Sequence, residues 1–275
     1  MKTCHVILTA PVTSVVTNPA FTGADEVVAG EYMRNRFPAY QGFFIGDGLQ
    51  MSQEPYGNVW KNTEYYAAIR YCNIFIENIG SVYNMQQDEK DIWTAEIKAL
   101  KAHYYFELMR RYGPVVLVPE NIDANANVTE MQLPRSPIDT CVNVIVRLLD
   151  EAIPVLPLFN QKEKSHSGYY CKEGAAALKA HTLLLAASPI FNGNKNYTNF
   201  VNKKGEKLFN AEYDPEKWKR AAEAAQEAID IADKGGKRLI RGDYQKTTAL
   251  LSTMADIEHS SLARNFEHDE ALQMF

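Results

Sequence analysis

The sequence has no run of 18 consecutive apolar residues, so none of its segments predicts a helix that spans a membrane. It also has no surplus of basic residues, because 29 Lys and Arg stand against 34 Asp and Glu and give a formal charge of −5. A chain of this charge has no excess of cations for a phosphate backbone, which argues against nucleic acid as a partner. The 15 glycines and 12 prolines are too few for a fibrous chain, and 46% hydrophobic with 23% charged residues is typical of a globular protein.

Sequence motifs for metal, cofactor and covalent chemistry are missing as well. The four cysteines, at positions 4, 72, 141 and 171, include no Cys-x-x-Cys pair, so no zinc or redox centre is predicted. No His-Glu-x-x-His, phosphate-binding glycine loop or Gly-x-Ser-x-Gly occurs. Adjacent carboxylates such as Asp150 and Glu151 point in different directions on a helix, which makes a glycosidase the weakest reading. The sequence therefore predicts no catalytic residue, no metal site and no cofactor.

Helical periodicity is present in five segments, which are residues 60–79, 88–112, 136–153, 172–188 and 214–234. In the first, apolar residues recur at steps of four and three, at Tyr65, Ile69, Cys72, Ile76 and Ile79. Alanines in the last two segments predict close helix packing. The fold class predicted is all-α, a tetratricopeptide-like superhelix of helix pairs with long irregular inserts at 36–59, 119–135 and 189–213.

Single positions give further expectations about this helical fold. Only residues 115–118, Val-Val-Leu-Val, have the pattern of a strand. Ser136 is expected to cap the third helix, with Pro137 in its first turn. His103 lies on an apolar helix face, where a satisfied core residue is a better interpretation than a ligand or a base. Cys72 and Cys141 fall on apolar stripes and are expected to be buried.

Aromatic residues are concentrated between residues 37 and 71, where 9 occur in 35 positions against 11% for the whole chain. Amide and carboxylate side chains are interleaved with these rings, and flat apolar faces next to hydrogen-bonding groups suit a sugar. Some of the rings, such as Tyr65, lie on the helix stripe and are expected in the core. The residues expected to bind a glycan are Tyr40, Asp47, Tyr56, Asn58 and Trp60.

A family resemblance rests on several motifs that follow one another in order. Residues 95–115, AEIKALKAHYYFELMRRYGPV, resemble the signature helix of the SusD/RagB proteins, with Lys101 in place of the usual Arg. Four more segments resemble family helices or their ends, at residues 66–73, 134–157, 172–187 and 218–229. The resemblance covers residues 60–234, the expected helical scaffold of a single SusD-like domain over 1–275, with a weaker match at 265–275.

The resemblance implies a non-enzymatic, surface-exposed lipoprotein of the outer membrane in Bacteroidetes. Such proteins bind glycans or other nutrients and form a lid on a SusC-like TonB-dependent transporter. Their lipid anchor is not visible in this sequence, because Cys4 has no apolar run before it. The irregular C-terminal half of the family is expected to be missing. A tetratricopeptide-type adaptor whose groove holds a peptide remains the alternative.

Overall fold

The helices of the protein account for its architecture, seen in a computed structural model that describes residues 22–24, 28, 30, 31, 41–53, 55, 58–60, 64–123 and 125–238. They are α4 (Gln41–Gly46), α5 (Tyr65–Asn78), α6 (Gln87–Tyr112), α7 (Val128–Met131), α8 (Ile138–Ala152), α9 (Lys172–Ala187) and α10 (Glu216–Lys234). Short 3-10 turns are η2 (Ile79–Ser81), η3 (Phe159–Gln161), η4 (Lys164–His166) and η5 (Lys195–Tyr197). Within the described ranges the only β pairing is an isolated bridge between Val201 and Lys207. The predicted all-α class is confirmed.

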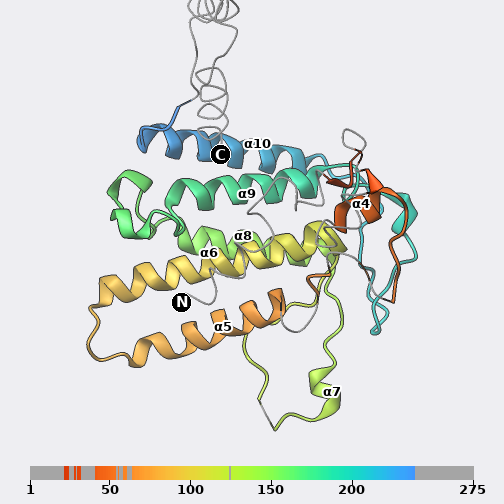
Figure 1. Cartoon of the computed structure of the whole chain (residues 1–275), viewed down its shortest axis with the longest axis horizontal. Helices are drawn as coiled ribbons and strands as arrows, with labels where there is room; N and C mark the ends of the chain where they lie inside the picture. Colours follow the sequence, from red (N-terminus) through yellow and green to blue (C-terminus); the bar gives the residue numbers. More distant parts are fainter. Residues whose placement is uncertain are drawn as a thin grey trace, which may run out of the picture. The chain divides into compact units, whose positions relative to one another are not determined.

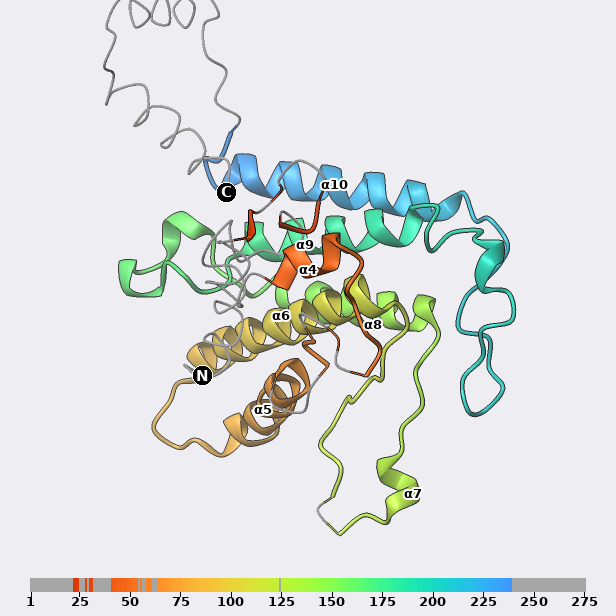
Figure 2. The ribbon, with the colours of Figure 1, turned by 45° about the vertical axis from the view of Figure 1, so that its right-hand side comes forward.

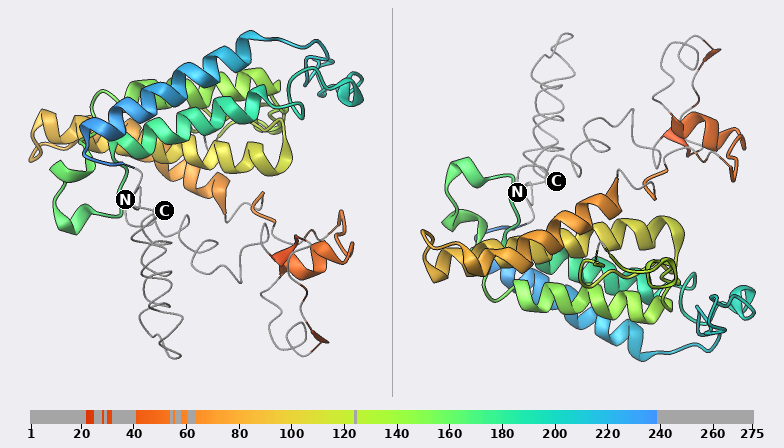
Figure 3. Two further views of the ribbon diagram at one scale, coloured as in Figure 1. Left: turned by 90° about the horizontal axis from the view of Figure 1, so that it is seen from above. Right: turned by 90° about the horizontal axis from the view of Figure 1, so that it is seen from below.

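The longer helices lie side by side in chain order, from α5 at the bottom of Figure 1 to α10 at the top. Contacts join α5 to α6, α6 to α8, α8 to α9 and α9 to α10, and the views from above and below in Figure 3 show these neighbours alongside one another. The chain divides into residues 1–236 and 237–275, and all these helices belong to the first unit. This succession of helix pairs is the tetratricopeptide-like architecture that the sequence predicts.

Small residues control the packing of the last helix pair. Ala221 and Ala224 of α10 are only 4% and 5% exposed, and they lie on the face of α10 that packs on α9. The prediction that alanine permits close packing is therefore confirmed. Two large apolar residues of α10 are more exposed, since Trp218 and Ile229 are 42% and 54% exposed.

Two helices begin later than the sequence predicts. Helix α5 begins at Tyr65 rather than at residue 60. Trp60 belongs instead to a turn, in which its backbone N–H donates to Oδ1 of Asn58, 3.1 Å away. Helix α8 begins at Ile138, and the predicted Ser136 cap is wrong. The backbone N–H of Ser136 instead donates to the carbonyl oxygen of Val115 at 2.8 Å, which leaves Pro137 at the N-cap position.

Residues 115–118 have no regular secondary structure, and the strand pattern is not realised, because no second strand among the described residues pairs with them. Tyrosine side chains take the place of a partner strand. The hydroxyl of Tyr66 accepts from the N–H of Val116 and donates to its carbonyl oxygen, both at 3.2 Å. The hydroxyl of Tyr105 does the same at Val118, at 2.8 and 3.0 Å. The segment is thereby fixed against α5 and α6.

The core and the inserts agree with the sequence in other respects. Cys72, Cys141 and Tyr65 are buried, as predicted. The insert that carries α7 extends away from the stacked helices (Figure 2). None of the helices in the described part of the chain is both long and apolar enough to cross a membrane.

Candidate functional site

Trp60, one of the five residues of the predicted glycan site, is part of an aromatic cluster at the C-terminal end of α6. Its ring meets those of Tyr66 and Tyr112 edge-on, each with a centroid distance of 5.2 Å. The guanidinium of Arg135 lies 4.9 Å from the Trp60 ring centroid. Asn58 joins this cluster, because its Oδ1 accepts from the Trp60 N–H and from the Tyr112 hydroxyl at 3.4 Å. Trp60 and Asn58 are both half-buried.

Of the other three predicted glycan-binding residues, the structure describes only Asp47. Asp47 is exposed, directly after α4, and its N–H donates to the carbonyl oxygen of Phe43 at 3.0 Å. Tyr40 and Tyr56 lie outside the described residues. The structure therefore brings Asn58 and Trp60 together, and the ligand-binding role of all five residues stays a prediction.

A cleft of about 780 Å³ lies among α5, α6, α8 and the segment after α6. We call it the Lys101 cleft, after the buried lysine of α6 in its lining. Asn73 of α5 and Arg147 of α8 are polar groups of the same lining, and Leu117 and Leu148 are among its apolar ones. Lys98 and the carboxylates Glu77 and Glu120 are in the lining as well. The cleft therefore combines cationic, anionic, amide and apolar surface.

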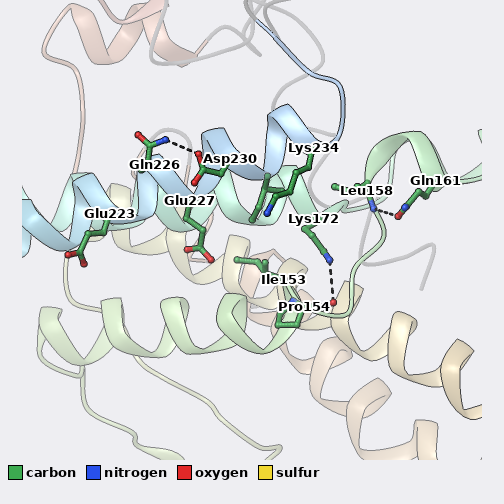
Figure 4. A pocket seen from close by; sticks show the side chains of 11 residues that line it. Ile153, Pro154, Leu158, Gln161, Lys172, Glu223, Gln226, Glu227, Asp230 and Lys234 are labelled. Atoms are coloured by element: carbon green, nitrogen blue, oxygen red, sulfur yellow. Dashed lines mark hydrogen bonds between the residues drawn. The ribbon is translucent and has the colours of Figure 1, made fainter.

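A second cleft, of about 720 Å³, lies between α10, the start of α9 and residues 153–161; we call it the α9–α10 cleft (Figure 4). Carboxylates of α10, among them Glu223, Glu227 and Asp230, line it together with Lys172. Most of its charged groups already have partners. Asp230 accepts from Gln226 at 2.8 Å, Lys172 donates to the Pro154 carbonyl at 3.3 Å, and Glu227 pairs with Lys179 at 2.7 Å.

Buried ionisable groups outside the clefts fix the insert before α9. Glu96 of α6 is 3% exposed, and its Oε1 accepts from the N–H of Tyr170 at 2.7 Å. Burial raises the pKa of Glu96 to about 7, against the opposing effects of this hydrogen bond and of Lys162. His103 bonds the Tyr170 hydroxyl through Nδ1, and burial lowers the pKa of its imidazole. His103 is thus a satisfied core residue, as predicted.

The adjacent carboxylates near the end of α8 are each paired with a neighbouring helix. Asp150 pairs with Lys179 of α9 and Glu151 with Lys98 of α6, both at 2.7 Å, so the two adjacent carboxylates do point to different neighbours. In the part of the chain that the structure describes, no group of three or more His, Cys, Asp or Glu side chains is placed to hold a metal ion.

The sequence did not predict the Lys101 cleft, because its lining comes from segments separated along the chain. One signal was available. Ile97, Lys101 and Tyr105 recur at every fourth position, so Lys101 shares a buried helix face with apolar residues. Because a lysine is rarely fully buried without a partner, a lysine on such a face indicates a polar group near the core.

The comparisons with known proteins agree with one another. The model of a SusD-like family, described as "starch-binding associating with outer membrane", matches residues 21–184. The solved structure named BT4246 is 28% identical, with a TM-score of 0.75 over 90% of this chain and 41% of its own. A SusD-like protein from Bacteroides fragilis is 24% identical, with a TM-score of 0.52 over 72% of this chain and 32% of its own. A laminarin-binding SusD-like protein is 18% identical, with a TM-score of 0.55 over 75% of this chain and 44% of its own.

These comparisons also set the extent of the likeness. The two structures under 25% identity support the fold alone, and no curated protein sequence is a significant match. The chain spans about two fifths of the length of BT4246. Because the family model covers more than half of the chain, the chain belongs to the SusD-like family.

Proposed function

We propose that the chain binds a glycan at the outer membrane surface, without cleaving it, and passes it to a SusC-like TonB-dependent transporter. Membership of the SusD-like family is the observation that carries this proposal. Two of the similar structures are named for such ligands, a laminarin-binding protein and surface glycan-binding protein A from Bacteroides uniformis. Attachment to the membrane is through a lipid anchor, as the resemblance implies.

The residues proposed to bind the glycan are Tyr40, Asp47, Tyr56, Asn58 and Trp60. Rings stack on the apolar faces of a sugar, while amides and carboxylates bond its hydroxyls. Trp60 is held in place by Tyr66 and Tyr112, and a ring that is fixed before binding loses little conformational entropy when a sugar stacks on it. Asn58 is held by the same cluster.

Native gels containing laminarin, starch or another soluble polysaccharide test this proposal. We expect the wild-type chain to be retarded by at least one polysaccharide, and Tyr56→Ala or Trp60→Ala to weaken binding about tenfold, the usual loss for a central aromatic contact. Asp47→Ala is the variant least able to disturb the fold, because Asp47 is exposed. Lys203→Ala, on an exposed turn, is the matched control.

Each result of the gel experiment bears on a different part of the proposal. Unchanged binding by the Tyr56, Trp60 and Asp47 variants would reject these site residues but leave glycan binding intact. No retardation by any polysaccharide would reject glycan binding, and release of reducing sugar would show an enzyme.

The peptide adaptor is the second candidate, and the α9–α10 cleft is the feature that favours it. Its mixed charges on a partly apolar floor of Ile153 and Leu158 suit an extended peptide better than a stacked sugar, because no aromatic side chain is in the lining. Protection of Glu223 or Lys234 in a footprinting experiment with a bound peptide, in a chain that no glycan retards, would select this function.

A further inference from the structure

Lys101 is a buried cation bonded only to neutral atoms. The residue is 5% exposed, and its ammonium donates to Oδ1 of Asn73 at 2.5 Å and to the carbonyl oxygen of Pro119 at 2.8 Å. An ammonium has three N–H donors, so two of them are used. Among the described residues no carboxylate lies within ion-pair distance of it, whereas Lys98, Lys179 and Lys217 all have one.

Burial of an unpaired positive charge is unfavourable and is expected to lower the pKa of the lysine that carries it. Desolvation lowers the pKa of Lys101, and the opposing effects of Cys72 and of the carboxylates Glu77 and Glu120, which line the same cleft beyond ion-pair distance, raise it only in part. Both oxygens of Glu77 already accept from Asn121, each at 3.1 Å, and Glu120 is exposed. The charge of Lys101 is therefore not compensated from within the described protein.

A second cation of the same cleft is also available to a ligand. The side chain of Arg147 is 65% exposed, and its Nε lies 4.0 Å from Glu151. Glu151 is already bonded to Lys98 at 2.7 Å, so its contact with Arg147 is the weaker of the two. An exposed pair at this distance adds little stability, and the arginine fork remains able to bind a carboxylate.

The remaining lining suits the body of a sugar. Leu117, Val144 and Leu148 give the cleft an apolar side, and the amide of Asn121 lies in the same lining. A pyranose ring carries C–H faces and hydroxyls that match these two kinds of surface. With about 780 Å³, the cleft has room for a short oligosaccharide.

We propose that the Lys101 cleft binds the carboxylate of a uronic acid unit in an acidic glycan, with Lys101 at its base and Arg147 at its rim. The inference rests on the proposed function, because that function makes the ligand a glycan, but the site is separate from Trp60 and its neighbours. The third N–H of the Lys101 ammonium would donate to this carboxylate, whose negative charge would neutralise the buried positive charge.

Isothermal titration calorimetry on the 275-residue chain tests this with tetragalacturonate and its neutral methyl ester. We expect the acid to bind about tenfold more tightly than the ester, the effect of one charge-assisted bond. Arg147→Gln should lose about fivefold in affinity for the acid, since its rim position is partly screened. Lys101→Met should reduce the preference for the acid to the part that Arg147 contributes, Lys101→Arg should retain it, and Lys203→Gln should leave it unchanged.

A second measurement covers the case in which Lys101→Met does not fold. The Lys101 ammonium can be followed by NMR in the wild-type chain, and its pKa should rise toward its ordinary value when tetragalacturonate is bound. A purely structural Lys101 would show no change. Equal affinity for acid and ester, or an unmoved Lys101, would overturn the acidic site while leaving glycan binding at Trp60 intact. Failure to bind any glycan would overturn both.

Discussion

Two lysines of the helical core, Lys179 of α9 and Lys101 of α6, differ in how their charge is neutralised. Lys179, beside the α9–α10 cleft, lies between Asp150 and Glu227, with 2.7 Å to each carboxylate. Lys101 bonds only an amide oxygen and a backbone carbonyl. Burial acts to lower both pKa values, but the two carboxylates reverse the effect and raise the pKa of Lys179, while that of Lys101 is lowered. A buried charge without a counter-ion is the better sign of a ligand, because a compensated one already has its structural role.

The largest effect is expected where the support of Lys101 is removed. Asn73→Leu takes an acceptor from the buried ammonium and a donor from the carbonyl oxygen of Val118, 3.2 Å away. We expect a loss of about 3 kcal/mol in the free energy of unfolding, the typical value for hydrogen bonds to a buried charge. Urea denaturation measures this. The matched control is Asn143→Leu, because Asn143 only accepts a 3.5 Å bond from Arg220 at the surface, and there we expect about 0.5 kcal/mol or less.

An equal loss of unfolding free energy in Asn73→Leu and Asn143→Leu would contradict the comparison. It would mean that the hydrogen bonds of Asn73 contribute no more to stability than a bond at the surface. A loss confined to Asn73→Leu would support it.

The next effect concerns a buried charge outside both clefts. The pKa of Glu96 is about 7 in the folded chain and 4.5 as a free carboxyl, raised by burial. The folded state thus holds the proton more tightly, so stability falls as pH rises from 4.5 to 7 and stays lower above that range. Relative to Glu96→Gln, the free energy of unfolding of the wild type should decrease by about 2–3 kcal/mol over this pH interval. Thermal unfolding at a series of pH values checks it, and parallel curves for the two proteins would contradict it.

The smallest effects compare the two lysines directly at alkaline pH. The folded pKa of Lys101 is below its unfolded value of 10.5, so its burial penalty is present at neutral pH and disappears as pH rises toward 10.5. The folded pKa of Lys179 is above 10.5, so its stabilisation is complete below 10.5 and is lost at higher pH. For Lys179 this amounts to about 1 kcal/mol or less, because its partners are half exposed.

Unfolding of Lys101→Met and Lys179→Met between pH 7 and 11 measures both effects. Relative to Lys101→Met, the free energy of unfolding of the wild type should increase as pH rises toward 10.5. Relative to Lys179→Met, it should decrease above pH 10.5. If both free-energy differences changed with pH in the same direction, the charges of the two lysines would be neutralised to a similar extent.

Sequence patterns predicted the helices because periodicity is a local property. Helices α6, α9 and α10 begin and end within about two residues of prediction. Errors arose where a distant group decides the local structure. The N-cap of α8 is Pro137 rather than Ser136, whose backbone N–H donates to the distant carbonyl oxygen of Val115. In residues 115–118 the partners of Val116 and Val118 are tyrosine hydroxyls rather than a second strand.

The candidate sites were harder to predict for the same reason. Aromatic clustering pointed to Trp60, and the structure adds that Tyr66, Tyr112 and Arg135 surround it. The Lys101 cleft depends on how α5 and α8 are placed against α6, and spacing along one helix does not specify that placement. Asn73 and Lys101 are 28 residues apart, and only the packed fold brings them into contact.

The tyrosines that hold residues 115–118 also bear on association between chains. An unpaired strand exposes N–H and carbonyl groups to which a strand of another molecule can add. At Val116 and Val118 these groups are already bonded by the Tyr66 and Tyr105 hydroxyls of the same chain. The backbone of this segment therefore offers no template for strand addition by another chain at these two residues.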